Sequence, residues 1–252
     1  MTAPIDAMTE RLFVDAGIGA GMRVLDLGCG NGEVSFLLAR LVGAGGEVVG
    51  IDRHGPSLES ARENAAGRGL TNLRFWQGEL GPLPAAWGRF DAMVGRRVLM
   101  YVARPVDVIR QLAQSLRPCG VVVFQEHDAT LVPGRVTPLP LHDQVQGWIW
   151  QTVKREGANV HMGFDLANVL EEAGLNVEQL RAEAVVQTHA TAYRGAAIVR
   201  AMLPRILEHG VASAAEIDLD TLEQRLADER AKTRSTYLSD MVFGAWARTP
   251  HA

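Results

Sequence analysis

A glycine-rich segment stands where the backbone could bind a ligand. Residues 28–32 read Gly-Cys-Gly-Asn-Gly, after the apolar run 22–27 and before the helical spacing of apolar residues in 33–42. Glycine has no Cβ and tolerates positive φ, so its backbone can approach a ligand closely. A helix that begins directly after such a turn adds unpaired N–H groups. We therefore predict a ligand-binding turn between a strand and a helix.

The residues around the turn indicate which ligand it binds. A dinucleotide fingerprint needs glycines at positions 28, 30 and 33, but position 33 is Glu33. Asp26 stands just before the turn, where a buried acid would repel a pyrophosphate and attract an ammonium group. The pattern favours a cationic cofactor that carries an amino acid over NAD.

Apolar runs alternate with helical segments along the first half of the chain and must position this turn. We expect strands at 22–27, 47–52, 72–76, 90–95 and 121–126, with helices at 33–42, 56–68 and 105–116. Such alternation is typical of a parallel sheet with helices on both faces, whose ligands bind beyond the carboxyl ends of the strands. The candidate site is then formed by the strand ends, namely Asp26 to Gly32, Asp52, Gln77 to Glu79, Gly95 to Arg97 and Glu126 to Asp128.

The alternation breaks after residue 128. We expect a helix at 5–18, a loop at 129–140, helices at 141–157, 164–174 and within 191–232, and strands at 176–187 and within 240–249. This predicts a single domain with a core at about 20–128, 163–187 and 236–252. The helical segments at about 1–19, 129–162 and 188–235 are expected to be lid insertions, or alternatively a dimer interface.

Composition excludes several classes of protein. The 252 residues are 47% hydrophobic and 21% charged, which is typical of a folded domain and excludes extensive disorder. The net charge of −4 and the absence of a basic run argue against nucleic acid as a partner. No apolar run has the roughly 18 residues that a membrane-spanning helix needs, and the acidic start does not resemble an export signal, so we expect a cytoplasmic protein without a membrane partner. Abundant Arg and scarce Lys indicate a bacterial source.

Five motifs in order resemble those of class I S-adenosylmethionine-dependent methyltransferases. The first is VLDLGCGNG at 24–32, and Asp52 follows at the end of the second strand. Gln77-Gly78-Glu79 is similar to the third motif of the family, with Glu in place of its usual Asp. FDAMVGRRVLMYV and LRPCGVVVF resemble the fourth and fifth motifs, with Cys119 replacing a glycine. The resemblance extends over about residues 22–128. Within the family, the chain is similar to the bacterial small-molecule, quinone-biosynthesis-like group.

The resemblance implies a fold, a cofactor and its contacts. The fold is a Rossmann-like, doubly wound sheet of seven mostly parallel strands, and the cofactor is S-adenosyl-L-methionine, which leaves as S-adenosyl-L-homocysteine. Asp26 would lie near the methionine amino group, Asp52 would hold both ribose hydroxyls, and Glu79 would meet the adenine amino group. The implied cofactor-binding residues are Asp26, Gly28, Cys29, Gly30, Asn31, Gly32, Asp52, Arg53, Gly78, Glu79, Leu80, Gly95 and Arg96. The alternative for the two aspartates is helix capping from an exposed loop.

Two absences narrow the kind of methyltransferase. The fourth strand is followed by Gly95-Arg96-Arg97-Val98, without the Asn/Asp-Pro-Pro-aromatic motif of enzymes that methylate adenine or glutamine amides. The strand end also lacks the Asp of metal-dependent catechol-type enzymes. We predict a metal-independent, in-line transfer to an oxygen or nitrogen of a small organic molecule by a monomer or homodimer. The alternatives are a protein or RNA methyltransferase and a non-catalytic cofactor-binding module.

The acceptor side lacks a signature, so its residues are chosen by chemistry and place. His127 and His142 are candidates for a general base or for positioning the substrate, because histidine titrates near neutral pH. The candidates for binding the substrate are Arg97, Tyr101, Trp148 and His161. The alternatives are a loop His127 bonded to Glu126 or Asp128, lid histidines exposed to solvent, arginines paired with a helix or with Glu126, and a tryptophan that is simply part of the core.

Overall fold

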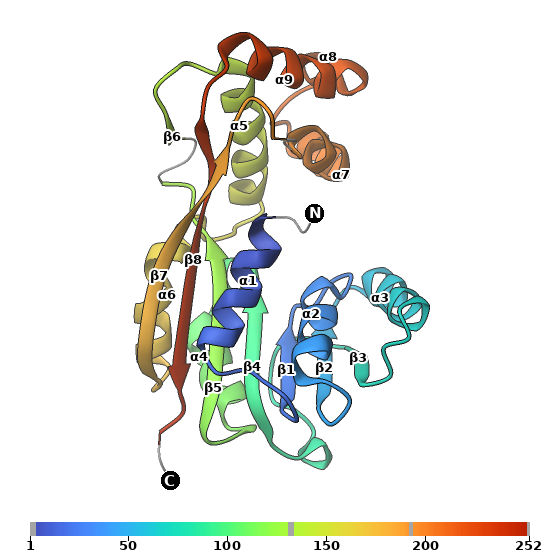
Figure 1. The fold of residues 1–252 in the computed structure, drawn as a ribbon, viewed down its shortest axis with the longest axis vertical. Helices are drawn as coiled ribbons and strands as arrows, with labels where there is room; N and C mark the ends of the chain where they lie inside the picture. Colours follow the sequence, from blue (N-terminus) through green and yellow to red (C-terminus); the bar gives the residue numbers. More distant parts are fainter. Residues whose placement is uncertain (1–3, 131–133, 192–193, 251–252) are drawn as a thin grey trace. The chain divides into compact units, whose positions relative to one another are not determined.

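The computed structural model describes residues 4–130, 134–191 and 194–250. Its first five strands are β1 (Arg23–Leu27), β2 (Glu47–Asp52), β3 (Leu73–Gln77), β4 (Phe90–Arg96) and β5 (Leu116–His127). They pair in parallel in the order β3-β2-β1-β4-β5, and the sheet continues through β8 (Tyr237–Arg248) to β6 (Gly134–Arg135) (Figure 1). The remaining strand, β7 (Asn176–Gln187), pairs with β8. The order reverses between β1 and β4, which is the point where sheets of this kind bind ligands.

The predicted α/β fold with a mostly parallel sheet is confirmed, with eight strands in the described residues where seven were predicted. The additional strand is β6, which lies in the segment predicted as a loop. It pairs antiparallel with β8 through Gly134 opposite Leu238 and Arg135 opposite Tyr237. A two-residue strand has no periodicity of its own, so only its pairing partner reveals it.

The border between the fourth helix and β5 also differs from the prediction. The helix expected at 105–116 is α4, Pro105–Ala113, and β5 begins at Leu116 instead of residue 121. Leu116 pairs with Phe90 ahead of a register irregularity, and Cys119 takes a positive φ of 59° within the strand. Residues 117–120, which follow the expected end of the helix, are here a kink inside a longer strand.

The chain divides into two compact units. The first comprises Met1–Glu126, Met162–Ala182 and Phe243–Ala252. Its helices are α1 (Pro4–Asp15), α2 (Glu33–Val42), α3 (Gly55–Gly67), α4 and α6 (Met162–Glu172). Its core packs the apolar faces of α1 and α2 on strands β1, β4 and β5, with Phe13, Val24, Leu38, Val94 and Val123 among the buried residues. This packing fixes the positions of the carboxyl ends of the parallel strands, which lie together at one edge of the sheet.

The first helix corrects one predicted boundary. Residues 1–19 were expected to form an insertion outside the core. Within the described part of that segment, Leu12 and Phe13 on α1 are buried in the same cluster as Val24 of β1. The apolar face of α1 covers the sheet, so this helix is part of the first unit.

The second unit comprises His127–His161 and Glu183–Val242. Its helices are α5 (Pro140–Arg155), α7 (Gly195–Glu208), α8 (Ala214–Ile217) and α9 (Leu219–Thr233), and α5 packs against both α7 and α9 (Figure 1). Val145, Trp148, Val199 and Leu222 are buried in it. Its limits lie near those of the predicted insertions, and a lid function for it stays a prediction. No helix of the described residues is long and apolar enough to cross a membrane.

Candidate cofactor site

The glycine-rich segment forms a tight turn between β1 and α2. Gly28, Gly30 and Gly32 have φ values of 61°, 51° and 87°, a region that residues with a Cβ avoid. The N–H of Gly32 donates to the Cys29 carbonyl at 2.9 Å, which closes the turn directly before α2. At Gly28 a Cβ would lie 2.3 Å from Cγ2 of Val98, so the backbone here packs against the segment that follows β4.

We expect Gly28→Ala to destabilise the turn strongly, because it combines a positive φ with a steric clash. The expected loss in unfolding free energy is about 2–4 kcal/mol, measured by urea denaturation. The double variant Gly28→Ala/Val98→Ala removes the clash but keeps the unfavourable φ, so it should recover part of the loss. A single variant as stable as the wild type would contradict the packing described for Gly28.

Asp52 fastens the turn to the end of β2. Its Oδ2 accepts the N–H of Gly30 at 2.8 Å, and its Oδ1 accepts the N–H of His54 at 2.8 Å. Adjacent pairing of β1 with β2 brings these residues together, since Leu27 lies opposite Ile51. An ionised carboxylate has about four acceptor positions, so these two bonds orient the group and leave lone pairs for ligand hydroxyls. Asp52 is half-buried at the end of β2, and its contact with ribose hydroxyls stays a prediction.

Asp26 presents an open acceptor inside the protein. It lies in β1, is 1% exposed, and its Oδ2 accepts the Ser35 hydroxyl at 2.5 Å. Its buried Oδ1 has no hydrogen-bond partner in the described part of the chain. Burial raises the pKa of this carboxyl to about 7, against the opposing effects of the Ser35 hydrogen bond and the Arg96 charge. A buried carboxyl with one open oxygen is suited to receive a cationic group.

The remaining residues of the turn face the site with backbone groups more than with side chains. Cys29 is buried, and its Sγ lies against β2, because a Cβ on Gly50 would approach it to 2.8 Å. Burial raises the pKa of this thiol. The Cys29 N–H donates to the Ile51 carbonyl at 3.0 Å. Asn31 and, beyond β2, Arg53 are exposed. Any cofactor contact of Cys29 is thus expected from its backbone.

The end of β3 lies directly beside the end of β2. The Gly78 N–H donates to the Asp52 carbonyl at 3.0 Å, and the Gln77 amide donates to the Arg53 carbonyl at 3.2 Å. Glu79 is exposed, whereas Leu80 is half-buried. The structure therefore brings Gly78 next to Asp52. The contact of Glu79 with an adenine stays a prediction.

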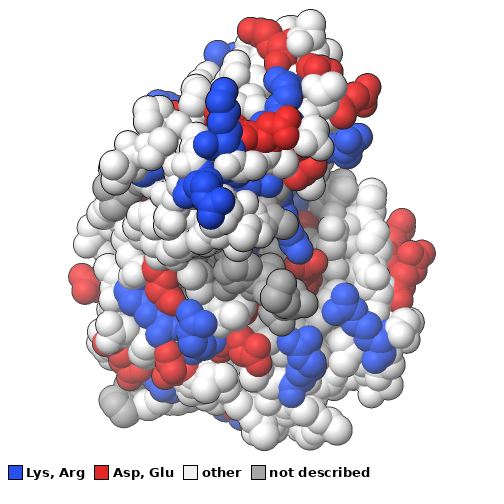
Figure 2. All heavy atoms as spheres, turned by 45° about the horizontal axis from the view of Figure 1, so that its top comes forward, with Lys and Arg blue, Asp and Glu red and all other residues white. Residues whose placement is uncertain are grey.

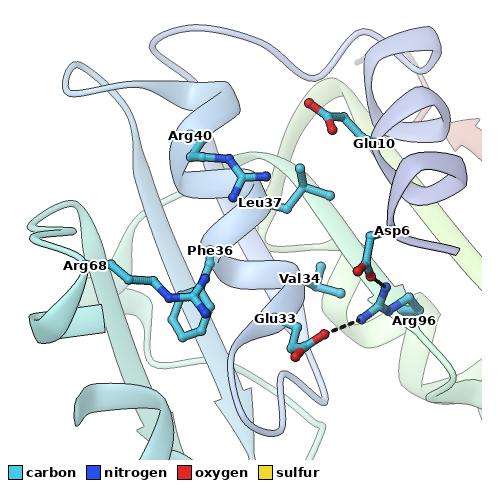
Figure 3. A pocket seen from close by; sticks show the side chains of 9 residues that line it. All are labelled: Asp6, Glu10, Glu33, Val34, Phe36, Leu37, Arg40, Arg68 and Arg96. Atoms are coloured by element: carbon cyan, nitrogen blue, oxygen red, sulfur yellow. Dashed lines mark hydrogen bonds and ion pairs between the residues drawn. The ribbon is translucent and has the colours of Figure 1, made fainter. Parts of the chain in front are cut away.

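The end of β4 changes the role expected for Arg96. Its Nη1 contacts Oδ1 of Asp6 at 2.9 Å, and its Nη2 lies 3.8 Å from Oε2 of Glu33 (Figure 3). The Arg96 side chain therefore fastens α1 to the start of α2, which is the helix-pairing alternative to cofactor binding. The physical reason is that two carboxylates already face this guanidinium. Gly95 lies against the ring of Phe124, where a Cβ would be 2.6 Å from Cε1.

A pocket of about 230 Å³ opens between α1, α2 and the end of α3. Arg96 and Asp6 form one wall of it, and Arg68 lies over the Phe36 ring at 4.4 Å on the opposite side (Figure 3). Its lining carries both signs of charge. On the face drawn in Figure 2 basic and acidic side chains are likewise interspersed.

The sequence placed Glu126 at a strand end and offered it as an alternative partner of His127 or the arginines, but did not predict its contact with the segment after β4. This last residue of the first unit's β5 segment is fully buried, and its Oε1 accepts the N–H groups of Val98 at 2.9 Å and Leu99 at 2.8 Å. Burial raises its pKa to about 7. An acid that ends an uninterrupted apolar strand, VVVFQE, was the available signal. Arg97 nearby is exposed with a φ of 57°, and Tyr101 is 47% exposed.

The predicted histidines lie in the second unit and differ in their surroundings. His127 is buried, and its Nδ1 lies 2.9 Å from Oδ2 of Asp240 on β8, instead of bonding Glu126 or Asp128. His142 is also buried, where exposure was the alternative to a functional role. Its Nδ1 lies 2.6 Å from Oε2 of Glu229, and burial lowers its pKa. His161 is exposed and bonds the Thr130 hydroxyl at 2.9 Å.

Glu229 also accepts the backbone N–H groups of Leu141 and His142, at 2.9 and 3.1 Å. The His142–Glu229 pair therefore fastens the start of α5 to α9, which is a structural contact.

Trp148 on α5 is 5% exposed, as expected for a core residue. Within the described residues no group of three or more His, Cys, Asp or Glu side chains could hold a metal ion. Transfer without a metal stays a prediction.

A parallel sheet with this strand order and a glycine turn at its reversal defines a Rossmann-like cofactor-binding domain. A family model described as a methyltransferase domain matches residues 18–183. The chain belongs to this family, the S-adenosylmethionine-dependent methyltransferases.

Individual relatives agree with this assignment. The chain is 31% identical over 124 residues to a demethylmenaquinone methyltransferase of Staphylococcus aureus, covering 49% of this chain and 51% of the relative. It is 34% identical over 166 residues to an arsenite methyltransferase of Halobacterium salinarum, covering 66% and 40%. These matches span about half the length of the relatives or less. The crystal structure of the YcgJ protein from Bacillus subtilis has the same fold, with a TM-score of 0.63 at 16% identity over 98% of this chain and 100% of that one.

Proposed function

We propose that this protein transfers a methyl group from S-adenosylmethionine to an oxygen or nitrogen of a small organic molecule, without a metal. The observation that supports it best is the glycine turn held to Asp52 by the Gly30 N–H, next to the buried and half-satisfied Asp26. The named relatives support a small acceptor, since demethylmenaquinone and arsenite appear in their names.

The residues present fit this cofactor. The open Oδ1 of Asp26 is an acceptor for its ammonium group, and the lone pairs of Asp52 are acceptors for two ribose hydroxyls. At Gly30 a Cβ would meet no described atom within 4 Å, so the backbone of the turn is open there and lets the ligand approach closely. Leu80 offers an apolar contact for a base. Bound S-adenosylmethionine supplies an activated methyl group on a sulfonium.

The protein then has to orient the acceptor, exclude water from the site and, for a hydroxyl acceptor, remove its proton. Transfer requires the acceptor atom, the methyl carbon and the sulfur in line, which is mainly a matter of positioning. Exclusion of water favours a reaction that disperses charge. For a hydroxyl acceptor we propose His127 as the base, because Asp240 holds its Nδ1 and its buried Nε2 has no other partner within the described chain. Arg97, Tyr101 and His161 remain proposed acceptor contacts. We assign His142 and Trp148 no role in transfer.

The test is transfer of label from methyl-labelled S-adenosylmethionine into a bacterial extract, followed by separation of small molecules from macromolecules. We expect label in the small-molecule fraction, unchanged by EDTA, and lost with Asp52→Ala. NMR of the product distinguishes oxygen and nitrogen from carbon acceptors. Label in protein or RNA would favour the alternative classes of methyltransferase. Cofactor binding without any label in the extract would favour a non-catalytic binding module.

A further inference from the structure

The segment that follows β4 is held by one buried side chain. After Arg97, whose φ is 57°, the chain turns into the short 3-10 helix Leu99–Tyr101. Two backbone N–H groups at the start of this turn, those of Val98 and Leu99, donate to the same Oε1 of Glu126. These donors have no strand partner of their own, so the carboxylate replaces the missing ladder.

The same segment packs directly against the cofactor turn. Val98 is buried, and its Cγ2 occupies the space in which a Cβ of Gly28 would lie at 2.3 Å. Gly28 has a φ of 61° and lies opposite the end of β4, one residue after the paired Leu27 and Gly95. A displacement of Val98 would therefore remove the support behind the glycine turn, and an inward shift would collide with it.

We propose that Glu126 is a positioning residue, which holds the Val98–Leu99 turn against Gly28 and thereby sets the affinity of the glycine turn for S-adenosylmethionine. The cofactor part of this inference rests on the proposed function, whereas the anchoring of the turn does not. Glu126 contacts the turn through backbone groups, so it acts through Val98 and not on the cofactor itself.

The geometry requires an acceptor and excludes an apolar substitute. Glu126 is fully buried. The Met100 N–H and the Arg97 charge, both on the same turn, favour its ionised form. Leucine at this position would leave the two buried N–H groups of Val98 and Leu99 without their acceptor, which weakens the packing of the turn. Glutamine keeps one carbonyl oxygen at the same reach and restores the acceptor without the charge.

The experiment measures hydrogen exchange of the Val98 and Leu99 amides and S-adenosylmethionine affinity by calorimetry, in the full-length protein. For Glu126→Leu we expect faster exchange at both amides and affinity weaker by about tenfold or more. Glu126→Gln should retain protection and bind within about threefold of the wild type. The matched control is Thr249→Val, which removes the acceptor of the Gly120 N–H, 2.9 Å away at the opposite end of β5. It should reduce stability but change neither measurement.

The outcomes separate this inference from the proposed function. Unchanged exchange at Val98 and Leu99 in Glu126→Leu would overturn the anchor, whatever the protein binds. Faster exchange with unchanged affinity would overturn the link to the cofactor. If the wild type binds no S-adenosylmethionine, the proposed function fails and the link fails with it, while the exchange result still decides the anchor. Should Glu126→Leu not fold, Val98→Ala takes its place, and an affinity equal to that of the wild type would refute the link through Gly28.

Discussion

Replacing Asp52 by alanine is expected to weaken S-adenosylmethionine binding by about 100-fold or more. The variant loses the acceptor proposed for two ribose hydroxyls, and hydrogen bonds to a charged group contribute about 1.5–3 kcal/mol each. It also releases the Gly30 N–H, whose bond to Oδ2 holds the glycine turn at 2.8 Å. Both effects reduce affinity, because the turn becomes less ordered and the ligand has fewer partners. Isothermal titration calorimetry measures the change.

A matched control separates ligand binding from general destabilisation. Asp91 is also an aspartate on this sheet, where its Oδ2 accepts the Arg23 N–H at 2.8 Å near the start of β4. Asp91→Ala should therefore reduce the stability of the sheet but leave cofactor affinity within about threefold of the wild type. Asp52→Asn, which retains one acceptor oxygen, should lie between the two. An Asp52→Ala variant that binds as tightly as the wild type would refute the ribose assignment.

Local patterns in the sequence were sufficient for most of the parallel sheet. Helix α2 and strand β2 have the predicted bounds, 33–42 and 47–52. Glycine-rich segments lie on both sides of α2 and directly before β2, so these ends are marked in the local sequence. The same reasoning placed Asp26 and Asp52 at strand ends, and adjacent parallel pairing then brings them to one edge. This part of the site follows from local signals and one topological rule.

The partners of polar side chains could not be predicted in the same way. Arg96 contacts Asp6, 90 residues away in the sequence, and His127 contacts Asp240 at the other end of the chain. Such pairs depend on how helices and strands pack, and no periodicity in the sequence encodes them. The partners of Glu126 were not predicted for a related reason, since they are backbone N–H groups, which every residue but proline carries. The contacts that the sequence could not predict are therefore those between distant segments.

Raising the pH from 5 to 8 is expected to lower the free energy of unfolding, with about 3 kcal/mol of the loss due to Asp26 alone. Burial raises the pKa of this carboxyl from 3.8 to about 7, so between these values the folded state holds a proton that the unfolded state has released. Bound protons favour the folded state at low pH, and this advantage is lost as the pH rises through 7. Chemical denaturation across this range measures it, and Asp26→Asn should abolish the Asp26 share of the slope.

Ionisation of Asp26 should also be coupled to binding of the cofactor. If Asp26 receives the ammonium group of S-adenosylmethionine, the ionised carboxylate is the form that binds, so binding at pH 7 should release about half a proton per site. Calorimetry in buffers of different ionisation enthalpy measures this number directly. Glu126, whose pKa is also raised to about 7, shares the pH window, so Glu126→Gln is the variant that isolates Asp26. Proton release that persists in Asp26→Asn and vanishes in Glu126→Gln would move the assignment from the ammonium contact to the turn behind Gly28.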